Sequence, residues 1–190
     1  MNKIVLTNIL KKKISDETTV VAISGFGGSG KSTLARAVAN ELGKSEIISV
    51  DDFAISRLNK RSSDWDSFDW SRFENEILIP LSRKDKEINY GVYDWEKDSI
   101  KSVKNILVSK FTILEGVGLF RKVFMKYFDY SIWINCPLGV ASERGRKRDN
   151  ELYKVNHDKE WTKIWTPNDR DYFEKYHPDL LADITVPFQD

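Results

Sequence analysis

The chain has 190 residues, 41% of them hydrophobic, and its 30 basic and 29 acidic residues leave a formal charge of +1. This length suits one α/β domain with a full core and is too short for two large domains. The balanced charge argues against a general attraction to nucleic acid or membranes, so neither is expected as a partner. The single cysteine, Cys136, excludes an internal disulfide, and no apolar run is long enough to cross a membrane. We therefore expect a cytoplasmic protein.

The first quarter of the chain predicts two helices and two strands in alternation. A leading amphipathic helix is expected between residues 4 and 14. The apolar run at 20–24 is typical of a buried parallel strand, and the apolar spacing over 31–42 predicts a helix that stops at Gly43. A second strand is expected over 47–50, and it ends at an acidic pair.

The residues between the first strand and its helix, GFGGSGKS at 25–32, match the pattern G-x-x-x-x-G-K-[ST]. Glycines lack the Cβ atoms that would stop the backbone from curling around an anion, and the N–H groups at the helix start point toward phosphate oxygens. In this pattern Lys31 reaches the β- and γ-phosphates, and the Ser32 hydroxyl ligates Mg²⁺. The stretch therefore predicts a nucleotide-binding phosphate loop rather than a flexible glycine turn.

Residues 53–98 interrupt the alternation and are rich in Trp, Asp and Arg, which predicts an inserted acceptor-binding lobe. Residues 71–74 read as a capping box that begins a helix, and Pro80 is expected to kink or end that helix. A strand is expected over 88–93, after which the lobe closes.

The second half returns to strand–helix order. Strands are expected at 111–114 and 130–134, followed by a helix with Pro137 in its first turn, a lid over about 141–158, a C-terminal helix and an edge strand at 184–186. Together these elements predict a P-loop NTPase fold: a three-layer α/β/α domain spanning 1–190, with a mostly parallel sheet of about five strands.

Polar residues follow the predicted strand ends, where open parallel sheets bind their ligands. Asp51 is the candidate carboxylate for the acceptor side, and Glu115 could hold Mg²⁺ through water. Arg144 and Arg148 lie four residues apart and so share a helix face, which suits two cations on one triphosphate. Each of these residues has a competing interpretation. Either Asp could cap the following turn, which is the interpretation we favour for Asp52. Glu115 could be an ordinary exposed residue in a turn, and the two arginines could belong to a solvated charge run.

The series GFGGSGKST (25–33), ISVDDF (48–53), VYDW (92–95) and ILEG (113–116), with an Arg lid and a closing Ala182-Asp183-Ile184, resembles the uridine kinase family. Its relatives include nicotinamide riboside kinase, phosphoribulokinase and bacterial pantothenate kinase. The resemblance implies that Asp51 is the general base, that Glu115 helps bind Mg²⁺, that Arg144 and Arg148 clamp ATP, and that Asp94 lies near the acceptor pocket. The chain departs from the family pattern at three positions on the acceptor side: Ala54, Asp98 and Ile100.

The predicted site falls into four groups of residues. The catalytic residues are Asp51 and Lys31; the nucleotide-binding residues are Gly25, Gly27, Gly28, Ser29, Gly30, Lys31, Ser32, Thr33, Arg144 and Arg148; the acceptor-binding residues are Asp51, Phe53, Tyr93 and Asp94; and the metal ligands are Ser32, Asp51 and Glu115.

The leading hypothesis is a phosphotransferase that uses ATP and Mg²⁺ to phosphorylate a primary hydroxyl of a small molecule, foremost the 5′-hydroxyl of a nucleoside. Nicotinamide riboside and nucleoside monophosphates are alternative acceptors, and a homo-oligomer is an open option. A regulatory nucleotide-binding switch is the alternative of another class. The one near match to a guanine-reading N-K-x-D, at 59–62, lacks the Asp.

Overall fold

The computed structural model describes residues 18–55 and 65–188. Three segments lie outside the described residues: 1–17, which include the predicted leading helix, 56–64 and 189–190. Within the described ranges, no helix combines the length and the apolar character that a membrane crossing requires.

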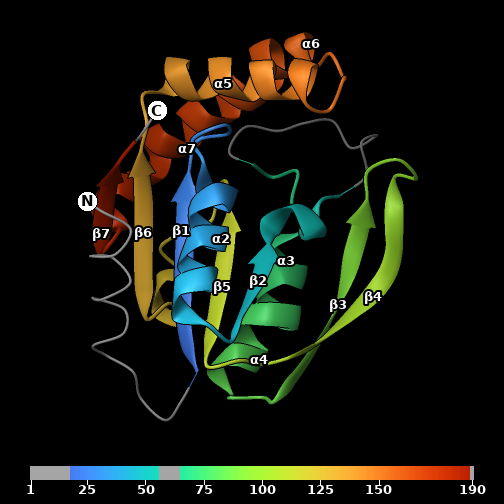
Figure 1. The fold of residues 1–190 in the computed structure, drawn as a ribbon, viewed down its shortest axis with the longest axis vertical. Helices are drawn as coiled ribbons and strands as arrows, with labels where there is room; N and C mark the ends of the chain where they lie inside the picture. The colour runs from blue at the N-terminus through green and yellow to red at the C-terminus, as the bar shows by residue number, and fades with distance from the viewer. Residues whose placement is uncertain (1–17, 56–64, 189–190) are drawn as a thin grey trace.

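A five-stranded parallel sheet forms the centre of the molecule (Figure 1). Its order is β2–β5–β1–β6–β7, and all four strand pairings are parallel. The strands are β1 (Thr19–Gly25), β2 (Ser45–Ser49), β5 (Phe111–Gly116), β6 (Tyr130–Asn135) and β7 (Ile184–Pro187). Because β1 lies between β5 and β6, its apolar run is buried on both faces, as the sequence predicted.

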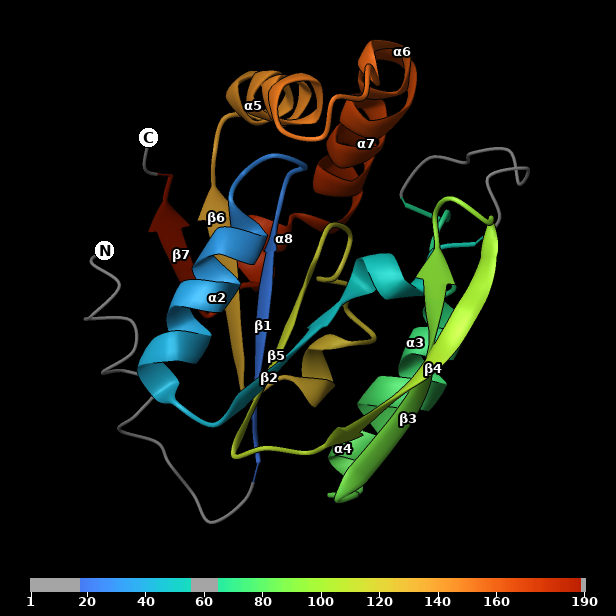
Figure 2. The same cartoon turned by 45° about the vertical axis from the view of Figure 1, so that its right-hand side comes forward.

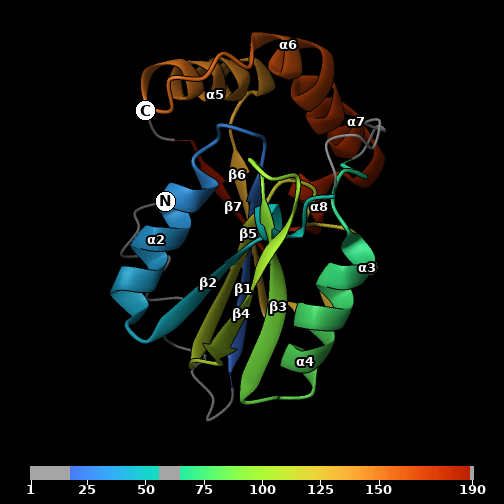
Figure 3. The same ribbon diagram turned by 90° about the vertical axis from the view of Figure 1, so that its right-hand side faces the viewer.

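Helices cover both faces of the sheet, so the predicted three-layer α/β/α architecture is confirmed (Figure 3). The helix α2 (Lys31–Leu42) lies on one face. A longer helical segment lies on the other, made of α3 (Trp70–Phe73), a π-helical turn η2 (Glu74–Leu78) and α4 (Ile79–Ser82). The fully buried Val38 of α2 and Phe73 of α3 belong to one continuous apolar core.

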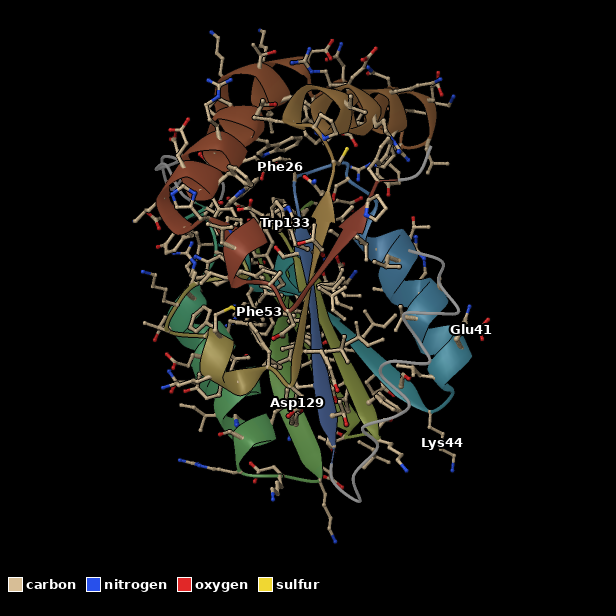
Figure 4. The ribbon with its side chains drawn as sticks, turned by 90° about the vertical axis from the view of Figure 1, so that its left-hand side faces the viewer. Phe26, Glu41, Lys44, Phe53, Asp129 and Trp133 are labelled. Atoms are coloured by element: carbon tan, nitrogen blue, oxygen red, sulfur yellow. The ribbon has the colours of Figure 1, made fainter. Side chains whose placement is uncertain are left out.

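The C-terminal helices lie across the carboxyl ends of the strands, above the phosphate loop (Figures 1 and 2). They are α5 (Leu138–Glu151), α6 (Asp158–Glu160), a π-helical turn η4 (Trp161–Trp165) and α7 (Thr166–Tyr176), and they are followed by α8 (Pro178–Leu181). Beneath them Phe26 meets Trp133 of β6 edge to face, with ring centroids 5.4 Å apart (Figure 4). This aromatic packing fixes the height of the loop above the sheet.

The helix of the inserted segment begins two residues earlier than predicted. It begins at Asp69, whose carboxylate accepts a hydrogen bond from the Arg72 N–H at 2.9 Å, so Ser71 is not the cap. Glu74, the expected partner in the capping box, instead accepts from the Tyr127 hydroxyl at 2.8 Å. The helical course also continues past Pro80 to Ser82, because a π-helical turn precedes the proline.

A two-stranded antiparallel hairpin stands apart from the main sheet, formed by β3 (Glu87–Asp94) and β4 (Ser99–Leu107). The strand β3 matches its prediction, but β4 was missed. Its apolar residues Ile100, Val103 and Ile106 recur every three positions rather than every two, and most of the strand is exposed. The segment that leaves the main sheet therefore extends to Leu107.

Candidate functional site

The phosphate loop joins β1 to α2 and curls as its glycines allow. Gly28 has φ +81°, and a Cβ atom there would lie 2.1 Å from the Ala141 carbonyl oxygen of α5. Only glycine fits both the left-handed backbone and this close approach. The C-terminal helices are therefore packed directly against the predicted nucleotide loop.

Lys31, at the start of α2, is buried, and its ammonium donates a hydrogen bond to the Phe26 carbonyl at 2.8 Å. Burial lowers the pKa of Lys31, while the nearby carboxylates of Glu115, Asp169 and Asp51 oppose that shift. The Lys31 ammonium therefore lies against the backbone of the phosphate loop, at the position where the motif places a phosphate-binding lysine.

Ser32 and Glu115 come together although they lie far apart in the sequence. The Ser32 hydroxyl donates to Glu115 Oε1 at 3.2 Å. The parallel register of β1 with β5 pairs Ile23 with Glu115, which puts this carboxylate level with the start of the loop. A hydroxyl and a carboxylate are hard oxygen donors of the kind that Mg²⁺ takes, so these two residues fit the predicted metal role.

Asp51 lies in the short 3₁₀ turn η1 (Val50–Phe53), directly after β2, where its N–H donates to the Ser49 hydroxyl at 3.3 Å. Solvent reaches the side chain even though protein atoms surround it on several sides. The pKa of Asp51 is raised to about 6, first by this desolvation and then by the negative charge of Glu115. A carboxylate with such a pKa is suited to take up a proton near neutral pH.

Asp52 has a different environment, and its carboxylate contacts the hairpin. Its carboxylate accepts a hydrogen bond from the Tyr90 hydroxyl of β3 at 3.2 Å, and its carbonyl accepts from Arg72 at 2.7 Å. Arg72 also reaches the Gly91 carbonyl at 3.0 Å. These contacts tie the turn that carries Asp51 to the hairpin and to the inserted helix.

The two arginines predicted to clamp ATP lie on α5 but have different surroundings. Arg148 is near enough to Lys31 and Asp51 to affect the pKa of both, and it donates to Asp149 at 2.8 and 3.0 Å. Arg144 instead stacks on the Phe188 ring at 4.5 Å, near the end of the chain. The structure therefore places Arg148 near the residues of the phosphate loop and Arg144 against Phe188.

Three of the predicted acceptor-binding residues, Phe53, Tyr93 and Asp94, make contacts within the protein. Phe53 is fully buried and stacks on Tyr90. Tyr93 is buried, and its hydroxyl donates to Asp98. The Asp94 carboxylate accepts hydrogen bonds from the backbone N–H groups of two following residues, and these bonds lower its pKa. It also pairs with a lysine at 3.6 Å. Two of the family departures thus act within the hairpin, since Ile100 packs against Gly91.

Several residues around the loop were missed by sequence reasoning. Buried Asp169 of α7 accepts a hydrogen bond from the Gly27 N–H at 2.7 Å. Buried Asp149 accepts from the Trp161 indole at 2.8 Å and lies 3.4 Å from His157. A lone acid in a polar helix carries no local signal of burial, so the sequence could not single out these residues. Trp161 itself is buried.

No family model matches the chain. The chain is 27% identical over 187 residues to a uridine kinase from Psychromonas ingrahamii, with 88% of each sequence covered. A possible uridine kinase from Bacillus stearothermophilus superposes with a TM-score of 0.73 at 21% identity, covering 97% of this chain and 96% of that one. A candidate fructose transport system kinase from Silicibacter sp. TM1040 gives the same TM-score at 22% identity, with 98% and 100% covered.

The chain has the fold of P-loop kinases, and its sequence is similar to that of a uridine kinase. This conclusion fits the phosphate loop, its Lys31 and the paired Ser32 and Glu115, which all come from the part of the sequence that carried the resemblance. The acceptor is a separate matter, because the relatives with this fold carry names that refer to different small molecules.

Proposed function

We propose that this kinase transfers the γ-phosphoryl group of ATP to a primary hydroxyl of a small molecule, and that the acceptor is the 5′-hydroxyl of a nucleoside. The observation that carries the proposal is the position of Asp51 beside Glu115, at the carboxyl edge of the sheet and in front of the phosphate loop. Phosphoryl transfer depends on positioning and on charge stabilisation, and these residues supply both.

In the proposed reaction, Asp51 accepts the proton of the acceptor hydroxyl as that oxygen bonds to the γ-phosphorus. The bond between this phosphorus and the bridging oxygen of ATP breaks, and ADP leaves. Lys31 and Arg148 stabilise negative charge on the transferring group. Ser32, Asp51 and Glu115 would hold Mg²⁺, which supplies charge neutralisation on the phosphate oxygens when bound.

Nicotinamide riboside and nucleoside monophosphates stay as alternative acceptors within the same reaction type. For a monophosphate, acceptor-side cations are needed, and Arg72 is committed to backbone carbonyls. Arg57 and Arg61 of the predicted lobe lie outside the described residues. A cytoplasmic location also stays a prediction.

The test is an ADP-release screen with Mg²⁺ and ATP over nucleosides, nicotinamide riboside, nucleoside monophosphates, pantothenate and hexoses. We expect ADP production that depends on a nucleoside and yields a 5′-phosphate detectable by mass spectrometry. Production that depends on a hexose instead would refute the nucleoside but keep the reaction type. Slow ADP release that no acceptor accelerates would favour a regulatory nucleotide switch.

A further inference from the structure

A buried carboxylate holds the first turn of the phosphate loop from outside the nucleotide motif. Asp169 lies on α7, and its side chain is among the most buried of the charged residues described, with 1% exposed. Its Oδ2 accepts from the Gly27 N–H at 2.7 Å, and its Oδ1 accepts from the Trp65 indole N–H at 2.9 Å. One side chain therefore bridges the phosphate loop and the inserted segment.

The contact with Gly27 is close and leaves no space for a side chain. A Cβ atom at Gly27 would lie 3.0 Å from the Trp161 ring and 3.4 Å from Asp169 Oδ2. Hydrogen bonds to a charged acceptor are about twice as strong as neutral ones, and a buried carboxylate is costly unless donors satisfy it. The direction of the Gly27 N–H is therefore set by Asp169.

Trp65, the other donor, has an unusual backbone for a bulky residue. Its φ is +56°, in the left-handed region, while its side chain is buried. The Trp65 carbonyl accepts from the Trp70 indole at 2.9 Å, so contacts on both sides hold this conformation. Strained backbone of this kind persists only where its surroundings impose it, and it is concentrated at functional sites.

We propose that Asp169 is a positioning residue for the nucleotide site: it orients the Gly27 N–H and, through Trp65, connects the inserted segment to the phosphate loop. The catalytic consequence of this role rests on the proposed function, whereas its effect on nucleotide binding does not. Asp169 acts through the backbone of the loop and is not assigned a contact with the reacting atoms.

The first test replaces Asp169 with Asn and measures the binding of a fluorescent ATP analogue with Mg²⁺. An amide offers one acceptor and one donor in place of two charged acceptors, so it cannot satisfy both N–H groups. We expect nucleotide affinity to fall about tenfold to a hundredfold, the range for losing a charged hydrogen bond. Glu174→Gln, an exposed change of the same kind on the same helix, is the matched control and should leave affinity unchanged.

The second test removes only the indole N–H, by Trp65→Phe. Although this donor reaches Asp169 and not the loop itself, we expect nucleotide affinity to fall about threefold to tenfold. The double variant should bind nucleotide no more weakly than Asp169→Asn alone, because both substitutions act on the same contact between Trp65 and Asp169. If Asp169→Asn fails to fold, Trp65→Phe carries the test.

Two results would overturn the proposal. If Asp169→Asn lowers the melting temperature but leaves nucleotide affinity unchanged, Asp169 has a structural role only. If the variant binds nucleotide more tightly, the carboxylate competes with phosphate for the Gly27 N–H. Should the wild type show no acceptor-dependent ADP release while Asp169→Asn still weakens nucleotide binding, the proposed function fails and the positioning role stands.

Discussion

Two glycines of α5 should differ in how alanine affects stability, because only Gly145 lies against the Trp161 ring. A Cβ atom at Gly145 would lie 2.2 Å from two atoms of the Trp161 ring, whereas at Gly139 nothing lies within 4 Å. Neither has a positive φ, so backbone strain does not separate them. Replacing glycine with alanine inside a helix stabilises the helix by up to about 1 kcal/mol. The effect is smaller near the helix N-terminus, where Gly139 lies.

At Gly145 this gain is outweighed by the clash. Overpacking a filled site costs about 1–3 kcal/mol and occasionally more. Trp161 cannot easily yield, because it is buried, its indole N–H is held by Asp149 at 2.8 Å, and its ring lies against Gly27. We therefore expect Gly145→Ala to destabilise the protein by about 1–3 kcal/mol.

The assay is thermal unfolding followed by circular dichroism, without nucleotide. For a chain of this size, 1 kcal/mol corresponds to about 2–4 °C, so Gly145→Ala should lower the melting temperature by about 2–12 °C. Gly139→Ala should keep it or raise it by up to about 4 °C. Equal melting temperatures for the two variants would refute the packing of α5 against Trp161.

Four further predictions, made with three variants, test the site directly. Asp51→Asn should lower acceptor-dependent turnover at least about a hundredfold with little change in ATP affinity, and near wild-type turnover would remove its role as base. Lys31→Ala should weaken ATP binding and turnover together, measured by calorimetry and ADP release; unchanged values would undo its place at the phosphates. Glu115→Gln should raise the Mg²⁺ concentration for half-maximal activity about tenfold, and an unshifted Mg²⁺ titration would argue against a metal role. Finally, the stability that Asp51 contributes as the neutral acid is present below its ordinary pKa of 3.8 and lost as the pH rises through about 6. The melting temperature of Asp51→Asn relative to wild type should therefore rise between pH 4 and 7 without ligand, and a constant difference would contradict the shift.

The fold was predictable because its strands carry local signals. The apolar runs of β1, β5 and β6 are buried on both faces, and each one follows or precedes a turn residue that marks its end. The capping box failed for a local reason as well. Asp69 and Ser71 are both good caps two residues apart, and the contact of Glu74 with Tyr127 removes the partner that would have favoured Ser71.

The lid illustrates what spacing alone cannot decide. Arg144 and Arg148 lie four apart on one helix, which places their Cβ atoms on one side, but long side chains then follow their nearest partners. A ring of Phe188 lies beside Arg144, and the carboxylate of Asp149 lies beside Arg148. Asp149 is the next residue on the same helix, whereas the contact with Phe188 depends on tertiary packing, so the spacing alone could not distinguish the two arginines.

The donor and acceptor halves of the site differ in how much of their geometry is local. On the donor side, one loop and one strand register bring Ser32 to Glu115, so a short motif carries the information. On the acceptor side, Tyr93 is held by Asp98, and Ile100 covers Gly91, which are contacts across a hairpin that had only one predicted strand. A likeness in the phosphate loop therefore constrains the use of ATP far more than it constrains the acceptor. The hairpin pairs, which differ from the uridine kinase pattern at Asp98 and Ile100, are where a change of acceptor would be encoded.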